Sequence, residues 1–299
     1  MNKNIFDHQL FALTTIIKTE IIANGFLYTS SASGFYYTEI TPKDPNVKGP
    51  QWNRVDGQWL ITNRHVLFQE IDGKKQIVDK LEFCFREVKA KTINWIPITL
   101  TRSDLIKCTK IHHDTNVDVV AINVSQYIMD LLLESKKTDR TIIIPGALTN
   151  KNLPENQPIT VEVTTDIIVA SYPKGFYDEV NKFPIVKSGI VASGWSLHFK
   201  GLPMFEIDAQ LFPGSSGGLV VTKPTNIVMI DGKMYQSSIK QFVFLGVYSG
   251  EYSWENKNQK ADGSVEIIHK SYGLGNVWYS YLIPEIIHSG VLISEINCG

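Results

Sequence analysis

Phe212-Pro213-Gly214-Ser215-Ser216-Gly217-Gly218, followed at once by the apolar segment Leu219–Val221, is the stretch of this 299-residue sequence that decides its fold. A nucleophilic serine needs an exposed hydroxyl on a tight turn, with backbone N–H groups directed at the oxygen that becomes negative during acyl transfer. Glycine provides backbone conformations that other residues avoid and leaves room for a substrate beside the serine. An ordinary flexible loop is the alternative interpretation of the same letters.

Two further motifs support the first interpretation. In Trp59–Val66, an apolar strand runs directly into His65, which places a histidine firmly at the edge of a cleft, as a general base requires. A lone histidine there would more often be structural. In Val117–Ile122, Asp118 is embedded in apolar residues, where an unpaired carboxylate is costly, so it needs a buried partner. His65 is the natural candidate, because a carboxylate that binds one ring nitrogen leaves the other free to accept the serine proton.

Asp114 is the rival for the acidic role. It lies in the polar segment His112–Asn116, whereas Asp118 has the apolar context, so we favour Asp118. The adjacent His112 and His113 could alternatively bind a metal with Asp114. Neighbouring histidines point apart, however, and no third ligand lies at a useful spacing, so we predict an exposed loop and no metal site.

The order His65, Asp118, Ser216, with gaps of 53 and 98 residues, completes a recognisable pattern. The sequence resembles the chymotrypsin-fold, trypsin-like serine peptidases, and within them the bacterial HtrA-like branch without a PDZ domain, over roughly residues 25–285. The supporting motifs are Ala32-Ser33-Gly34-Phe35, TNRHV around His65, DVVAINV from Asp118, ASYPKGF, Lys187-Ser188-Gly189 and FEIDAQLFPGSSGG before and through Ser216.

The expected fold is all-β, with two antiparallel six-stranded β-barrels, an N-terminal helix and a short C-terminal helix. Short segments rich in β-branched and aromatic residues, separated by turn-forming residues, favour such barrels. We expect a helical extension over residues 1–24, a first barrel over 25–150 with His65 and Asp118, and a second over 151–299 with Ser216 and the closing helix. Near-helical spacing of apolar residues predicts the first helix, and the polar composition of Glu251–Ser264 predicts a long loop.

The resemblance implies roles for further residues. An oxyanion hole would be formed by the N–H groups of Gly214 and Ser216, with that of Ser215 near them. The segment from Phe244 to Gly250 would be the strand against which a substrate pairs. The residues implied for substrate binding are Gln210, Ser249, Gly250, Gly273 and Gly275. Because Gln210 is neutral, we expect a small or apolar side chain before the cleaved bond.

The position before Ser216 in the sequence holds Ser215, where secreted zymogens of the family carry an aspartate. No activation-cleavage motif precedes Gly25 either. We therefore do not expect activation by a newly cut amino terminus, and an activating protein partner is the alternative means of control.

Bulk composition excludes several other functions. A net charge of −1 and mixed charges provide no basic face for nucleic acid, and no segment approaches the roughly 18 apolar residues of a membrane span. The three cysteines, Cys84, Cys108 and Cys298, lack the paired spacing of a disulfide framework or zinc knuckle. We expect a cytoplasmic protein without cofactors that acts on proteins or peptides.

The predicted activity is therefore that of a serine endopeptidase, which hydrolyses peptide bonds through an acyl-enzyme. A catalytically silent or latent domain that binds peptides by strand addition is the runner-up. The complete set of His65, Asp118 and Ser216 argues against it, because a binding module does not need all three. An esterase with the same triad is the third reading.

Overall fold

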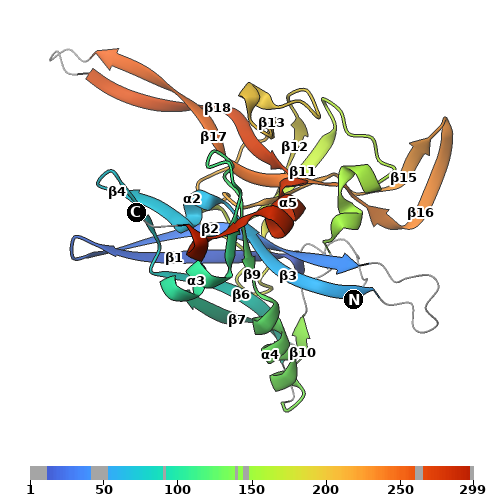
Figure 1. The fold of residues 1–299 in the computed structure, drawn as a ribbon. Helices are drawn as coiled ribbons and strands as arrows, with labels where there is room; N and C mark the ends of the chain where they lie inside the picture. The colour runs from blue at the N-terminus through green and yellow to red at the C-terminus, as the bar shows by residue number, and fades with distance from the viewer. Residues whose placement is uncertain are drawn as a thin grey trace.

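The computed structural model describes residues 12–41, 53–89, 92–138, 141–143, 148–259 and 265–296, and it is mostly β. A closed six-stranded barrel in the second half of the chain confirms one predicted barrel (Figure 1). Its strands pair in the order β11-β12-β13-β18-β17-β14 and have the bounds Asp166–Ser171 (β11), Ile185–Val191 (β12), Met204–Asp208 (β13), Leu219–Thr222 (β14), Phe244–Gln259 (β17) and Val265–Tyr279 (β18).

The first half forms a nine-stranded sheet instead of a second six-stranded barrel. Among the described residues its pairing follows the path β10-β6-β1-β2-β3-β9-β8-β19, with β7 paired to β6, and does not close. The strands are Thr14–Ala23 (β1), Phe26–Thr41 (β2), Arg54–Thr62 (β3), Lys80–Lys89 (β6), Thr92–Thr101 (β7), Thr109–Ile111 (β8), Val120–Asn123 (β9), Thr141–Ile143 (β10) and Val291–Leu292 (β19). Through β19, the C-terminal part of the chain returns to this first sheet.

The helix predicted over residues 1–24 is wrong for Thr14–Ala23, which is strand β1, although Ala12 and Leu13 just before it are helical. This strand pairs with β2 on one side and with β6 on the other. Ile16 and Ile17 are adjacent yet both buried, since both faces of the strand are covered. A short apolar run of this kind cannot be distinguished from a helix face by periodicity, and β-branched Thr and Ile favour the strand. Residues 1–11 lie outside the described residues.

The polar loop predicted over Glu251–Ser264 is also wrong, because strand β17 continues to Gln259. Its backbone pairs with β18 as far as Gln259 opposite Val265, and Figure 1 shows the two strands projecting from the barrel as a long hairpin. Backbone hydrogen bonds form this ladder whatever the side chains are, so polar composition was a poor guide. Residues 260–264 lie outside the described part of the chain.

Short helices and hairpins complete the fold. The predicted C-terminal helix is confirmed as α5, which buries four apolar side chains on one face. The remaining elements are α2 (Arg64–Leu67), α3 (Arg102–Cys108), α4 (Ser125–Ser135), α5 (Leu282–Ser289), the hairpin of β4 (Phe68–Ile71) with β5 (Lys74–Ile77), and the hairpin of β15 (Thr225–Ile230) with β16 (Lys233–Gln241).

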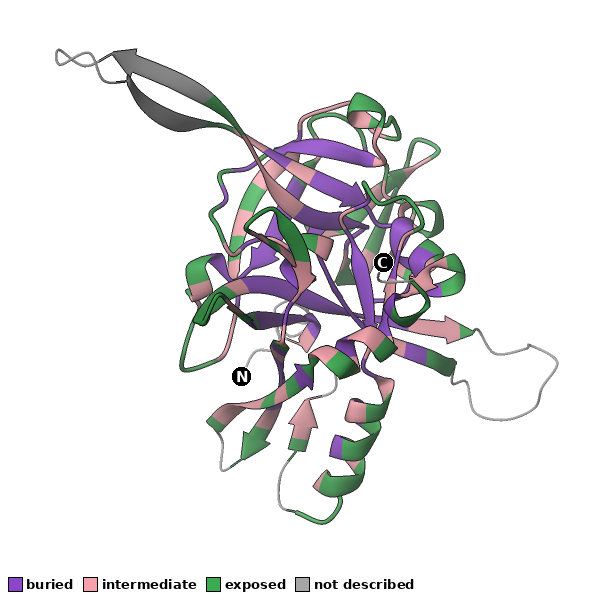
Figure 2. Cartoon of the chain, turned by 60° about the vertical axis from the view of Figure 1, so that its left-hand side comes forward, coloured by how far each residue is buried: buried purple, intermediate pink, exposed green. Residues whose placement is uncertain are grey.

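The two halves share one continuous hydrophobic core, which Figure 2 shows as the buried centre of the molecule. Phe35 of β2 meets Phe244 of β17 edge to face, with ring centroids 5.4 Å apart. A buried arginine also joins the halves: Arg86 of β6 donates to the Tyr172 hydroxyl at 2.8 Å and to the Lys182 carbonyl. Close packing of this kind leaves side chains little room to move, so residues from the two halves are held in fixed positions at their boundary.

One buried carboxylate in the barrel makes stability depend on pH. Glu206 of β13 is 2% exposed, and neither carboxylate oxygen has a hydrogen-bond partner in the described structure. Burial raises the pKa of Glu206 from 4.5 to about 7, and Lys200 opposes this shift. Between these two pH values the folded protein keeps a proton that the unfolded chain releases, so the free energy of unfolding falls as the pH rises.

In the wild type, Glu206 should therefore lower the free energy of unfolding by on the order of 3 kcal/mol between pH 4.5 and pH 7.5. Glu206→Gln is expected to abolish this fall. Urea unfolding at several pH values measures it, with the exposed Glu162→Gln as the matched control. Parallel pH profiles for wild type and Glu206→Gln would contradict the assignment.

Candidate active site

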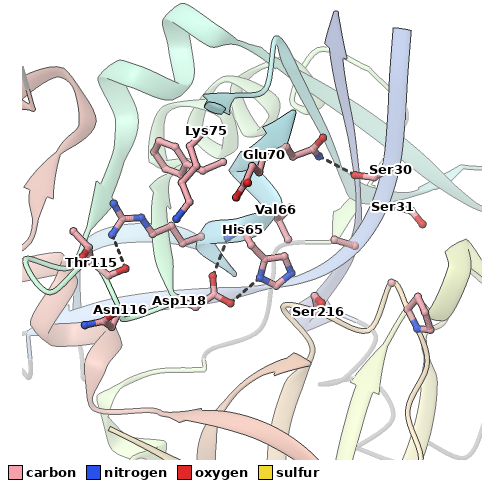
Figure 3. A pocket seen from close by; sticks show the side chains of 16 residues that line it. Ser30, Ser31, His65, Val66, Glu70, Lys75, Thr115, Asn116, Asp118 and Ser216 are labelled. Carbon is pink, nitrogen blue, oxygen red and sulfur yellow. Dashed lines mark hydrogen bonds and ion pairs between the residues drawn. The ribbon is translucent and has the colours of Figure 1, made fainter. Parts of the chain in front are cut away.

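A cleft between the two halves brings together residues from distant parts of the chain. Its volume is about 930 Å³, and Figure 3 shows the side chains that line it. Strand β2 contributes Ala32, and helix α2 contributes His65. Gly214 and Ser216 come from residues 212–218, the candidate nucleophile turn. Asp118 precedes β9 and completes the group, so the three predicted catalytic residues line one cavity.

Asp118 binds His65 through both carboxylate oxygens. Oδ2 lies 2.7 Å from His65 Nδ1, and Oδ1 accepts from the His65 backbone N–H at 2.8 Å. Asn63, which lies between the end of β3 and the start of α2, donates from Nδ2 to the Asp118 carbonyl at 2.7 Å. Because the carboxylate accepts the proton on Nδ1, the neutral ring presents Nε2 as a base.

Ser249 adds a further contact to the same carboxylate, which the sequence analysis missed. Its hydroxyl donates to Asp118 Oδ2 at 2.6 Å. The sequence placed Ser249 only at the border of a substrate pocket, and a serine after the apolar strand Phe244–Tyr248 has nothing to mark it as a partner of a residue 131 positions away. Three donors therefore orient the Asp118 carboxylate.

Ser216 lies beside the His65 ring, on the side away from Asp118 (Figure 3). Its hydroxyl donates to the Ser249 carbonyl at 2.9 Å. Within the described residues, no hydrogen bond joins this hydroxyl to His65. Catalytic hydrogen bonds are often absent or long before substrate binds, so the arrangement fits a resting site.

The turn that carries Ser216 depends on two glycines in the left-handed region, Gly214 with φ of +90° and Gly217 with φ of +81°. The N–H groups of Gly214 and Ser216 make no hydrogen bond in the described part of the chain, so both can serve a ligand. Ser215 differs: its N–H donates to the Phe212 carbonyl at 3.0 Å. We therefore correct the predicted oxyanion hole by omitting Ser215, whose amide is used within the turn.

Gly217→Ala is expected to destabilise the fold by about 3 kcal/mol. A Cβ atom there would lie 2.0 Å from the Ser33 carbonyl oxygen and 2.4 Å from Thr62 Oγ1, in addition to the unfavourable φ. Gly232→Ala is the matched control, since Gly232 has φ of +72° but nothing within 4 Å of the added atom. Thermal unfolding of both variants separates crowding from backbone strain, and equal losses would contradict the crowding.

Two of the predicted substrate-binding residues, Gln210 and Gly273, line a second cavity of about 510 Å³. Pro213 borders both cavities, so the second lies next to the turn that carries Ser216. Gly250 and Gly275 are not among its lining residues; they lie in the paired backbones of β17 and β18, where Gly275 is opposite Glu251.

Glu251 also lines this second cavity, although the sequence analysis treated it as part of a loop. Its Oε1 accepts from the Leu211 N–H at 3.1 Å, so the carboxylate is turned toward the cavity. Asp208 contributes a second acidic residue, and none of the lining residues is basic. The lining of the cavity therefore carries two acidic side chains and no basic one, and Lys187 Nζ lies 4.7 Å from the centre of the ring of Phe212, one of the lining residues.

The rival acidic residue Asp114 has other partners. Its Oδ1 accepts from the backbone and side chain of Asn116, both at 2.9 Å. His112 Nε2 lies 3.2 Å from Glu285 Oε1, and His113 bonds the Ser289 carbonyl of α5. The described residues contain no cluster of three or more His, Cys, Asp or Glu side chains that could hold a metal ion.

Comparison with known proteins identifies the family of this chain. The family model of the trypsin-like peptidase domain matches residues 33–228, which include His65, Asp118 and Ser216. The chain belongs to this family. No curated protein matches the sequence of this trypsin-like peptidase domain.

Several solved structures are similar to this trypsin-like peptidase domain at low sequence identity. Protease Anisep from Arthrobacter nicotinovorans is 13% identical, with 91% of each chain covered and a TM-score of 0.43. The apo MamO protease domain from Magnetospirillum magneticum is 10% identical, with 93% of this chain and 97% of that chain covered and a TM-score of 0.41. The inactivated protease paralogue S-I1 of the scabies mite is 11% identical, with 95% and 98% covered and a TM-score of 0.40.

Two further predictions for this trypsin-like peptidase domain concern its three cysteines and membrane-spanning segments. Cys84 and Cys108 are free, and burial raises the pKa of the Cys84 thiol to about 12. Cys298 lies outside the described residues. Among the described helices, none is long and apolar enough to cross a membrane.

Proposed function

We propose that this protein is a serine endopeptidase with His65, Asp118 and Ser216 as its catalytic triad. The observation that carries the proposal is the bidentate contact of Asp118 with His65, which leaves Nε2 facing the cleft beside Ser216. A carboxylate fixed in this way sets the tautomer of the ring and stabilises the imidazolium that forms.

In the proposed reaction the Ser216 hydroxyl turns from the Ser249 carbonyl toward His65 Nε2. As His65 takes the proton, Ser216 Oγ bonds to the substrate carbonyl carbon, and the carbonyl oxygen becomes negative. Gly214 and Ser216 N–H groups receive that oxygen. His65 then gives its proton to the leaving nitrogen as the C–N bond breaks. Water releases the acyl group by the same steps, with its proton taken by His65 and returned to Ser216.

The charge of the second cavity favours a basic side chain before the cleaved bond. Glu251 and Asp208 provide two carboxylates there, and Gln210 accepts hydrogen bonds without adding charge. This departs from the small or apolar preference expected from Gln210 alone, because the Glu251 side chain turns inward and lines the cavity, which was the alternative to a solvated loop carboxylate. A lysine or arginine side chain would pair with the Glu251 carboxylate.

We expect wild type to cleave peptides after Lys or Arg faster than matched peptides with Leu at that position. Glu251→Gln should lower kcat/KM for the basic peptides about 10-fold, the loss of one charge-assisted hydrogen bond, and leave the Leu peptide unchanged. Glu70→Gln, a charge change in the other cavity, is the control. A wild type that prefers the Leu peptide would contradict this preference.

Fluorophosphonate labelling tests the catalytic assignment itself. Wild type, Ser216→Ala and His65→Ala are treated with the probe, and mass spectrometry locates the modified residue. Labelling at Ser216 that both substitutions abolish supports an assembled hydrolase site. Labelling at another serine, or labelling that survives in His65→Ala at the wild-type rate, would contradict the triad. Matched ester and peptide substrates then distinguish an esterase from an endopeptidase.

A latent domain that binds peptides or awaits an activating partner is the second candidate, and one contact favours it. The Ser216 hydroxyl is bonded to the Ser249 carbonyl and not to His65. Folded wild type that takes no label would support this candidate. The HtrA-like branch without a PDZ domain, the cytoplasmic location and the lack of nucleic-acid and membrane partners stay predictions.

A further inference from the structure

Ser33 of β2 uses all of its polar groups to connect the parts of the candidate site. The residue is 1% exposed. Its hydroxyl donates to the Gly214 carbonyl at 2.9 Å and accepts from the Tyr172 N–H at 2.8 Å. Its N–H donates to the Ser216 carbonyl at 2.8 Å, and its carbonyl accepts from Thr62 Oγ1 at 2.9 Å. Ser33 therefore contacts the nucleophile turn, the segment beside it and the strand that leads to His65.

These contacts bear on the direction of the two free N–H groups of the turn. In a trans peptide the C=O and N–H bonds point in opposite directions, and the described chain has no cis peptide bond. The Gly214 N–H is therefore aimed by the Pro213 carbonyl, which accepts from the Lys174 N–H at 2.7 Å. The Ser216 N–H is aimed by the Ser215 carbonyl, which accepts from the Gly218 N–H at 2.9 Å.

The Ser33 hydroxyl supports the direction of the Gly214 N–H indirectly, through two hydrogen bonds to neighbouring peptides. It holds the Gly214 carbonyl, which fixes the peptide plane that follows Gly214. It also holds the Tyr172 N–H, two residues before the Lys174 N–H that binds the Pro213 carbonyl. Lys174 has φ of +50°, so its short segment depends on outside contacts to keep this conformation.

We propose that Ser33 is a positioning residue for acyl transfer, whose hydroxyl keeps the Gly214 N–H directed into the cleft. This inference rests on the proposed function, because it assigns Gly214 N–H to the developing oxyanion. A donor that is already oriented requires no reorganisation when the negative charge forms. Without the hydroxyl, the Gly214–Ser215 peptide can rotate about Gly214, and the buried Tyr172 N–H loses its partner in the segment whose Lys174 N–H holds the Pro213 carbonyl. Both changes loosen the neighbours of the peptide that carries the Gly214 N–H.

The kinetic test compares Ser33→Ala and Ser33→Thr with Ser171→Ala. Ser171 is the matched control, since its buried hydroxyl bonds Ser215 Oγ at 3.1 Å and makes no hydrogen bond in the described structure to the Gly214 carbonyl or the Tyr172 N–H, the two partners of the Ser33 hydroxyl. Ser33→Ala should lower kcat for peptide hydrolysis about 100-fold and leave KM within about two-fold. Ser33→Thr, which keeps the hydroxyl, should recover most of kcat, and Ser171→Ala should retain it.

The affinities for a pair of inhibitors provide a measurement that does not depend on the stability of the variant. A peptide aldehyde forms a hemiacetal with Ser216, and the hemiacetal oxygen accepts a hydrogen bond from the Gly214 N–H. The matching peptide alcohol has no carbonyl group and cannot form this hemiacetal. Ser33→Ala should weaken the aldehyde by the same factor as kcat and leave the alcohol unchanged. Equal weakening of both inhibitors, or equal kcat losses in Ser33→Ala and Ser171→Ala, would overturn the proposal.

A crystal structure of Ser33→Ala separates this inference from the proposed function. We expect the Gly214 carbonyl to leave its wild-type position. A carbonyl that stays in place would overturn the positioning role even if the enzyme is active. Wild type that folds but neither takes the probe nor hydrolyses peptides would contradict the proposed function, and with it the role in acyl transfer.

Discussion

Ser216→Ala and His65→Ala are each expected to lower kcat for peptide hydrolysis by about a million-fold, and the double variant is expected to be no slower than either single variant. Ser216 supplies the atom that attacks, and His65 accepts its proton, so each residue is ineffective without the other. The geometry supports this unit, because His65 lies between Asp118 and Ser216 in the cleft (Figure 3). Residual activity should come from binding and from the oxyanion donors alone.

Single-turnover kinetics with a fluorogenic peptide measures these losses. His198→Ala is the control, since His198 is an exposed histidine that bonds the Tyr281 hydroxyl. KM should change little in the active-site variants, because neither side chain contributes mainly to ground-state binding. Losses that multiply in the double variant would show that the two residues act independently, and would contradict the proposed triad.

Asp118→Asn is expected to lower kcat about ten-thousand-fold without unfolding the protein. An amide has nearly the shape of the carboxylate, yet it can present an N–H to His65 Nδ1 and so move the ring proton to Nε2. The ring then cannot accept the Ser216 proton. The amide also removes the negative charge that stabilises the imidazolium.

Asp114→Asn is the matched control for that substitution. Asp114 is the rival acidic residue by sequence, and its carboxylate bonds Asn116 instead of His65. We expect kcat within about three-fold of wild type, since no charge next to the ring is lost. Steady-state kinetics and thermal unfolding of both variants decide the assignment, and a larger loss in Asp114→Asn would reverse it.

Local signals were sufficient to select the three proposed catalytic residues. The glycines around Ser216, the strand before His65 and the apolar setting of Asp118 each reflect a requirement that acts within a few residues: a positive φ, a strand end, or the cost of a buried charge. The structure places all three in one cleft. The short closing helix α5 was predictable for the same reason, because its apolar face recurs at the helical period.

Periodicity and composition failed where tertiary contacts outweigh them. Thr14–Ala23 has helix-like apolar spacing, but strands on both sides bury it as β1. The polar hairpin of β17 and β18 reads as a loop, but its backbone ladder continues to Gln259. In both cases the deciding feature is pairing with another strand, which the composition of a single segment does not reveal.

The sequence alone determined the family, the predicted triad and the β-rich class, because these depend on residue type and short spacing. Which residues contact the proposed triad and the turn beside it depends on the tertiary structure. Ser33 reaches Gly214 across 181 positions, Ser249 reaches Asp118 across 131, and Glu251 reaches Leu211 across 40. A serine or glutamate carries no local mark of such a partner, since a hydrogen bond depends on where the fold places two groups and not on their separation in the chain.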